Sequence, residues 1–145
     1  MYVFDVRLAD ADRAVNESLT IRVAQHPSET VEYLVTRLLA YCLEYTEGIA
    51  FSKGLSDPDE PAIVVRDLTG VLQAWIEVGA PDADRLHWAA KAAPSVTVYA
   101  HRGLDALVAR LDRRMSLDLT VSDHTLYVSL GDETLTGSIE ERRLD

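Results

Sequence analysis

Five carboxylate side chains are of the type that binds a divalent metal ion: Glu29, Glu32, Asp59, Glu60 and Glu77. Magnesium prefers oxygen ligands and retains several waters, so two or three such groups are enough to hold it. One or two bound ions would activate water and stabilise an in-line phosphoryl displacement. If these side chains meet in the fold, they predict a Mg²⁺ or Mn²⁺ site with hydrolytic chemistry.

Glu77 is the most informative of these acids, because it interrupts an otherwise apolar strand, VLQAWIEVG (71–79). Burial without a partner is costly for a carboxylate, so Glu77 needs solvent, an arginine or a metal ion. Asp59 and Glu60 end an acidic loop and enter the preceding strand, so adjacency of the two strands would bring them near Glu77. A solvated loop and an arginine-paired Glu77 are the alternatives.

The longest predicted helix opens at residues 26–29 (HPSE), where a proline in the first turn loses no hydrogen bond. Apolar residues recur at three- and four-residue steps over 31–42, and Gly48 is the predicted end of the helix. Glu32 falls on the margin of this apolar stripe, and Glu29 lies farther round. Negative charge in a first turn is favourable by itself, so both acids also have a purely structural explanation.

Alternating and helical patterns predict the elements that must position these acids. The expected strands are 2–9, 18–24, 62–66, 71–79, 95–100, 116–121, 125–130 and 134–139, and the further expected helices are 82–93 and 104–113. The strand–helix–strand passage over 71–100 predicts a parallel pair with a crossover. The expected fold class is α/β (α+β), a mixed sheet flanked by helices with antiparallel strands at both ends, in a single domain over residues 1–145.

The composition restricts which binding partners and which cellular compartment are expected. A net charge of −10 argues against broad nucleic-acid binding, so a nucleic-acid role would rest on a local patch, whereas a basic protein partner suits the acidic surface. No apolar run approaches the roughly 18 residues of a membrane span, and the N-terminus does not have the pattern of a signal peptide. The lone Cys42 lies in the apolar stripe, which predicts a buried thiol and fits a reducing cytoplasm.

Several familiar sites are absent from the sequence: it has no glycine-rich phosphate loop, GxSxG elbow, HExxH motif or paired cysteines. The four histidines are scattered without metal-ligand spacing. Trp75 and Trp88 could stack on a base, but packing in the core or at its edge is the expected role.

The chain resembles the YaeQ family of bacterial proteins over essentially its full length. The resemblance rests on LTIRVAQHPSETVEYLVTRLLAYCLEY (19–45), FSKGLSDPDEPA (51–62), LQAWIEVGAPD (72–82) and DRRMSLDLTV (112–121). It implies a restriction-endonuclease-like α/β roll, a variant of the PD-(D/E)xK nuclease superfamily, in which a helical acid and two strand acids surround a metal. On this resemblance Glu29 or Glu32 is the helical acid, Asp59 or Glu60 precedes the second core strand, and Glu77 belongs to the third.

The lysine of that superfamily is missing, because Gly79 stands where it would follow Glu77. Some superfamily members carry the cation on the following helix, where Lys91 would supply it here. A solvated surface lysine is the alternative.

Two main functions follow. The first is a metal-dependent phosphodiesterase or nuclease acting on nucleic acid or a nucleotide-like phosphodiester, with Glu77 and Lys91 as catalytic groups. The second is a non-enzymatic interaction module on a nuclease-like scaffold, linked to transcription or nucleic-acid machinery through a protein partner. A small-ligand site at residues 26–29 is a lesser alternative, which Glu29 disfavours for anions. Strands at both chain ends leave sheet edges, so monomer and dimer both stay open.

Overall fold

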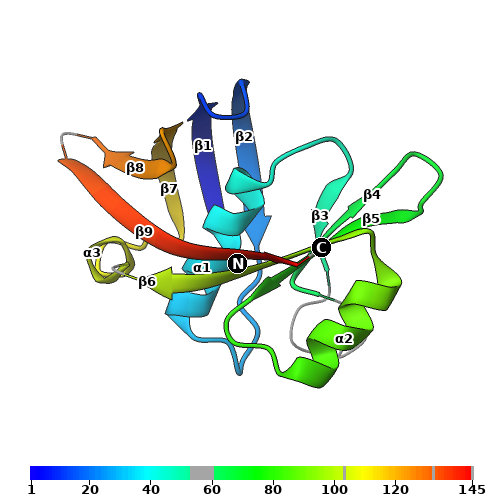
Figure 1. Cartoon of the computed structure of the whole chain (residues 1–145). Coiled ribbons are helices and arrows are strands. Elements are labelled where there is room, and N and C mark those ends of the chain that lie inside the picture. The colour runs from blue at the N-terminus through cyan, green and yellow to red at the C-terminus, as the bar shows by residue number, and fades with distance from the viewer. Residues whose placement is uncertain (53–60, 103, 132, 145) are drawn as a thin grey trace. The chain divides into compact units, whose positions relative to one another are not determined.

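The computed structural model describes residues 1–52, 61–102, 104–131 and 133–144, and they form two compact units (Figure 1). The first unit combines Met1–Gln25 with Arg102–Ser138, and the second combines His26–His101 with Ile139–Asp145. Strands and helices occur in both units. The mixed α/β class expected from the sequence is therefore confirmed, and the single-domain organisation stays a prediction.

Five strands contribute to the sheet of the first unit, in the spatial order β2, β1, β7, β8, β9. They are β1 (Tyr2–Asp10), β2 (Val15–Val23), β7 (Arg114–Ser122), β8 (Thr125–Leu130) and β9 (Glu133–Leu144). β1 and β2 form an antiparallel hairpin, and β8 pairs antiparallel with both β7 and β9. β1 and β7 run parallel, a pairing that the sequence pattern did not predict.

Alternation along β1 explains why this sheet has one apolar face. Phe4, Val6 and Leu8 are buried, whereas Arg7 between them is exposed. Successive side chains of a strand point to opposite faces, so one face is buried while the other stays polar.

The described part of the second unit contains two helices, the end of β9, and the four strands β6, β5, β4 and β3 in that spatial order. Apart from β9, these elements are α1 (Val31–Leu43), β3 (Ile49–Phe51), β4 (Ile63–Arg66), β5 (Leu72–Val78), α2 (Ala83–Ala92) and β6 (Ser95–Arg102). β3, β4 and β5 pair antiparallel, and β5 runs parallel to β6. Because α2 connects β5 to β6, the predicted crossover is confirmed.

The two helices pack on opposite faces of the second sheet. Ile76 of β5 joins Ala40 of α1 in one apolar cluster, whereas its neighbour Trp75 packs with Ala89 of α2. Glu77 is two residues after Trp75, so its side chain lies on the same face of the strand. The acid therefore projects on the side of the sheet that α2 covers.

The start of α1 differs from the sequence prediction. Its N-cap is Thr30, whose side chain accepts a hydrogen bond from the N–H of Tyr33, so Pro27 and Glu29 precede the helix instead of opening it. A separate turn holds this segment, because the N–H of Glu29 donates to the carbonyl of His26 at 2.8 Å. Local hydrogen bonding therefore overrides the preference of proline for a first helical turn.

Two other expectations are corrected. α1 ends five residues before Gly48, and the helix expected over 104–113 shortens to α3 (Asp105–Val108). Beyond α3 the N–H groups of Arg110 and Leu111 reach back only three residues, which closes tight turns in place of an α-helix. The three-residue β3 was not predicted. Within the described residues, no helix combines the length and the apolar character that crossing a membrane requires.

Candidate functional site

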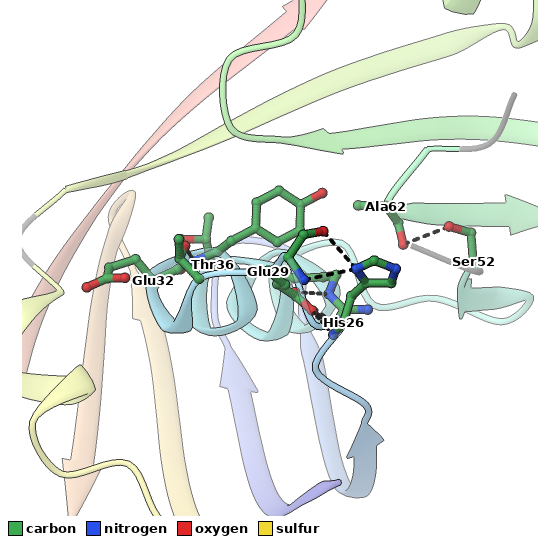
Figure 2. A network of polar contacts seen from close by, with 10 residues as sticks. His26, Glu29, Glu32, Thr36, Ser52 and Ala62 are labelled. Atoms are coloured by element: carbon green, nitrogen blue, oxygen red, sulfur yellow. Dashed lines mark hydrogen bonds and ion pairs between the residues drawn. The ribbon is translucent and has the colours of Figure 1, made fainter. Parts of the chain in front are cut away.

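Glu29 is buried just before α1 and is held by an arginine two turns along the helix. Its carboxylate accepts hydrogen bonds from Nε and Nη2 of Arg37, each at 3.0 Å, and both side chains are almost fully buried. The N–H of His26 donates to the same carboxylate at 2.9 Å, within the polar network of Figure 2. The guanidinium also lies 5.2 Å from the ring centroid of Phe51. A two-pronged contact of this kind makes a strong, geometrically fixed ion pair.

Glu77 lies near the C-terminal end of β5 and is only 5% exposed. Arg85 in the first turn of α2 donates from Nε to Oε2 at 2.6 Å and from Nη2 to Oε1 at 3.1 Å. These hydrogen bonds from Arg85 to Glu77 raise the pKa of Arg85. The side chain of Arg85 keeps 28% exposure, so solvent reaches this pair on one side. Asp82 caps α2 by accepting from the N–H of Arg85, which fixes the turn that positions the arginine.

Tyr33 brings the two ion pairs into one electrostatic neighbourhood. Burial raises the pKa of Tyr33 most, the charges of Glu77 and Glu29 raise it further, and those of Arg37 and Arg85 lower it. The charges of both ion pairs therefore act on the titration of one tyrosine. Two carboxylates and two guanidinium groups leave this cluster without net charge.

These acids do not fit a metal ion in the arrangement observed. A magnesium ion needs carboxylate oxygens that are free to coordinate, whereas Glu29 and Glu77 each accept hydrogen bonds from two guanidinium nitrogens. No group of three or more His, Cys, Asp or Glu side chains among the described residues is placed to hold a metal. The Mg²⁺ or Mn²⁺ site expected from the sequence stays a prediction.

The remaining acids of the predicted site do not join this cluster in the described part of the chain. Glu32 is half-buried in the first turn of α1, and Figure 2 shows its carboxylate pointing away from Glu29. Asp59 and Glu60 lie outside the described residues. Of the five predicted acids, Glu29 before α1 and Glu77 on β5 are each buried and held by an arginine.

Gly79 explains why a lysine is missing after β5. Its φ of +99° is a backbone conformation that L side chains rarely adopt, and its N–H donates to the carbonyl of Tyr99 at 2.8 Å. A lysine here would be strained whatever space it found. Lys91, the expected substitute, is exposed in the last turn of α2, and its catalytic role stays a prediction. The cation that reaches the strand acid is Arg85.

Sequence reasoning missed Arg37 and Arg85, although the sequence carries a signal for both. Each follows its acid by eight residues, and Arg37 interrupts the apolar run of α1. A charge in that position needs a partner. The chain has 12 arginines, however, so spacing by itself does not assign the pairs.

A hollow of about 440 Å³ lies on the polar face of the first unit's sheet. Arg7, Ser18 and Asp118 are cross-strand neighbours there and line it together with other polar side chains. Its exposed polar lining suits water better than an apolar ligand.

Comparison with known proteins identifies the family to which the chain is related. The family model described as "YaeQ protein" matches residues 1–106. Uncharacterized YaeQ proteins of Salmonella typhi and Escherichia coli K12 are 35% and 33% identical, each alignment covering 89% of this chain and 87% of the relative.

Solved structures give the same result. The crystal structure of a YaeQ protein from Pseudomonas syringae has a TM-score of 0.89 and 33% identity, covering 97% of this chain and 93% of that one. The YaeQ protein from Xanthomonas axonopodis pv. citri has a TM-score of 0.88 and 26% identity, covering 97% and 96%. The fold and the site define a mixed α/β protein with two acid–arginine ion pairs whose carboxylates are buried. The chain belongs to the YaeQ family.

Proposed function

We propose that this chain is a non-enzymatic interaction module on a restriction-endonuclease-like core, linked to transcription or nucleic-acid machinery through a protein partner. One observation carries the proposal: Glu29 and Glu77 are each bound through both carboxylate oxygens by an arginine. Arginine keeps its charge at all physiological pH values, so a change of pH does not release either carboxylate as a free ligand. In this proposal the acids of a nuclease site serve as structural ion pairs.

Each guanidinium supplies the positive charge that a metal would otherwise supply to a buried acid. A buried carboxylate needs a cation with well-aligned donors, and the planar fork of arginine provides both. A metal ion bound to Glu29 would take the carboxylate away from Arg37, which is only 4% exposed. Loss of one member of a buried pair is strongly unfavourable. This favours a permanently charge-balanced cluster over a metal-binding one.

A metal-dependent phosphodiesterase or nuclease is the second candidate, and one observation favours it. The charges of both Glu29 and Glu77 act on Tyr33, which favours a shared environment for the acid before α1 and the strand acid, as the PD-(D/E)xK resemblance implies. Solvent reaches Arg85, which would take the part of the superfamily's lysine. The acids at 59–60 would complete a ligand set for Mg²⁺ or Mn²⁺, and nucleic acid or a nucleotide-like phosphodiester would be the substrate.

Metal titration and cleavage assays decide between the two candidates. The purified chain is titrated with Mg²⁺ and Mn²⁺ by calorimetry and incubated with single-stranded DNA, duplex DNA and RNA. Glu77→Gln is compared with Glu47→Gln, which changes an exposed acid outside the cluster. For the module we expect neither saturable metal binding nor cleavage, and a lower melting temperature for Glu77→Gln only.

Saturable metal binding, with cleavage that Glu77→Gln abolishes and Glu47→Gln retains, would reject the interaction module and support the metal-dependent enzyme. Cleavage that survives Glu77→Gln would come from a contaminating nuclease, and the interaction module would remain the preferred function.

A further inference from the structure

The polar face of the first unit's sheet carries two adjoining hollows over the neighbouring strands β2, β1 and β7 (Figure 1). Their volumes are about 440 Å³ and 220 Å³, and their linings share Arg7, Ser18 and Asp118. Residues 5–9 of β1 line both hollows in turn, which corresponds to about 13 Å at the usual rise of a strand. Together the hollows form one open groove that follows β1.

Small polar side chains line this groove. Successive residues of a strand alternate between its two faces, so every second residue reaches the polar face. From β2 and β7 these side chains are all exposed, and they are Asn16, Ser18, Thr20, Ser116, Asp118 and Thr120. Ala9 pairs with Asn16 on one side and Thr120 on the other, and its small side chain leaves the floor of the larger hollow open.

Arg7 and Asp118 are opposite charges in register on adjacent strands, yet they do not form an ion pair. Both are exposed, and among the described residues neither side chain has a hydrogen-bond or ion-pair partner. Two residues earlier on β1, Asp5 is engaged instead, because its carboxylate accepts from Nη2 of Arg114 and from the hydroxyl of Thr20, each at 3.0 Å. The middle of the groove therefore offers a group that only donates beside one that only accepts.

This pair matches a neutral polyhydroxyl ligand better than an ion. A hydroxyl both donates and accepts, so neighbouring hydroxyls of one sugar ring can accept from the guanidinium of Arg7 and donate to the carboxylate of Asp118. Hydrogen bonds to charged groups contribute more than those between neutral groups. An anion attracted by Arg7 would be repelled by Asp118, and a cation would meet the reverse arrangement.

An aromatic side chain stands beside the groove. Tyr127 of β8 is the partner of Thr120 in register, shares its face of the sheet and is 38% exposed. Its ring is a rigid apolar surface with a polar tip, on which the C–H groups of a sugar ring can pack while the phenol hydroxyl stays in water.

We propose that this groove binds a short neutral oligosaccharide, with Arg7 and Asp118 holding neighbouring hydroxyls of one sugar unit. A free amino acid also carries both charges, but it would leave the hydroxyls of Ser18 and Thr120 without a role. The groove lies wholly in the first unit, whereas Glu29 and Glu77 belong to the second. The inference goes beyond the proposed function and does not depend on it.

The test is an NMR titration of the isotope-labelled full chain with maltotriose, cellotriose and tri-N-acetylchitotriose, compared with glutamine and inorganic phosphate. We expect saturable shifts with at least one trisaccharide, confined to the amides of residues 5–9, 16–20 and 116–120. Arg7→Ala and Asp118→Ala should each raise Kd at least about tenfold. The control Arg22→Ala, which removes an exposed arginine from the same face outside the groove, should change Kd less than about twofold.

Three results would overturn the proposal: no saturable shift with any trisaccharide, shifts spread over the whole surface, and an equal loss of affinity in Arg22→Ala. Saturation by phosphate or glutamine alone would also overturn it, and would assign the groove to an anion or to a free amino acid. All three variants change exposed side chains, so we expect them to melt at the wild-type temperature. A loss of affinity at that temperature reports on binding and not on folding.

Discussion

Arg85 donates to both carboxylate oxygens of Glu77, from Nε at 2.6 Å and from Nη2 at 3.1 Å. The contact joins the end of β5 to the first turn of α2, and the guanidinium lies 5.7 Å from the ring centroid of Trp75. The crossover between the parallel strands is therefore anchored by an ion pair at its start. Its contribution to stability can be measured directly.

A double-mutant cycle should show that Glu77 and Arg85 are coupled. Glu77→Gln and Arg85→Gln should each destabilise the chain, and the double variant should lose less than the sum, with a coupling of about 0.5–3 kcal/mol. Urea denaturation of the four proteins gives the values. Strict additivity would mean that the pair contributes nothing beyond its separate side chains.

The pair formed by Glu29 should be more important for stability, because it is buried on all sides. Glu29→Gln leaves Arg37 without its carboxylate, and we expect a loss of about 3–5 kcal/mol. Glu32→Gln is the matched control on the same helix end, with a change within about 0.5 kcal/mol. Chemical denaturation measures both, and equal losses would show that general helix charge matters more than the ion pair.

Introducing a lysine two residues after Glu77, as in the PD-(D/E)xK pattern, should not create activity. Gly79→Lys places a side chain at a φ of +99° and should cost about 1–3 kcal/mol of stability. Gly79→Ala should lose a similar amount, since the strain belongs to the backbone, while Ala80→Lys at the exposed neighbouring position should be nearly neutral. Melting curves and a Mn²⁺-supplemented cleavage assay test this. A stable, cleaving Gly79→Lys variant would contradict the prediction.

The loop that joins β4 to β5 should lose order in acid. Hydrogen bonds from the Thr69 hydroxyl and from the amides of Val71 and Thr69 lower the pKa of Asp67 below its usual 3.8. A depressed pKa in the folded state means that the stabilisation is complete above pH 3.8 and disappears as the pH falls through the lower, folded value. Amide hydrogen exchange at Thr69 and Val71 should accelerate in that range, and Asp67→Asn should remove the pH step.

Cys42 should be chemically silent in the folded chain. Burial raises the pKa of its thiol from 9.0 to about 12, so the reactive thiolate is scarce at neutral pH. Because the neutral thiol is favoured only in the folded state, this contribution to stability is present below pH 9.0 and declines as the pH rises above it. A thiol reagent at pH 8 should react with Cys42 only after guanidinium has unfolded the chain. Rapid labelling of the native chain would show instead that α1 opens.

Local patterns were sufficient to predict most of the elements and the need of Glu77 for a partner. A charge inside an otherwise apolar strand requires one, and an arginine was among the alternatives. The start of α1 was wrong because the hydrogen-bonded turn from His26 to Glu29 competes with helix formation.

The arginine partners could not be predicted in the same way. Which of 12 arginines meets which acid depends on how α2 returns over the sheet and where α1 begins, and both are set by packing. The parallel pairing of β1 with β7 was missed for a related reason. Register between strands so far apart in the chain is determined by the shared core, and neither strand signals it locally.

That parallel pairing also sets an order of events while the chain is being made. Val3 pairs with Arg114 and Asp10 with Val121. One edge of β1 therefore has no strand partner until β7 has been synthesised. The hairpin with β2 can close early, but Phe4, Val6 and Leu8 then remain without the opposing leucines of β7. We therefore expect the sheet of the first unit to be completed late in synthesis, and this early hairpin to be the segment most exposed to misassociation until then.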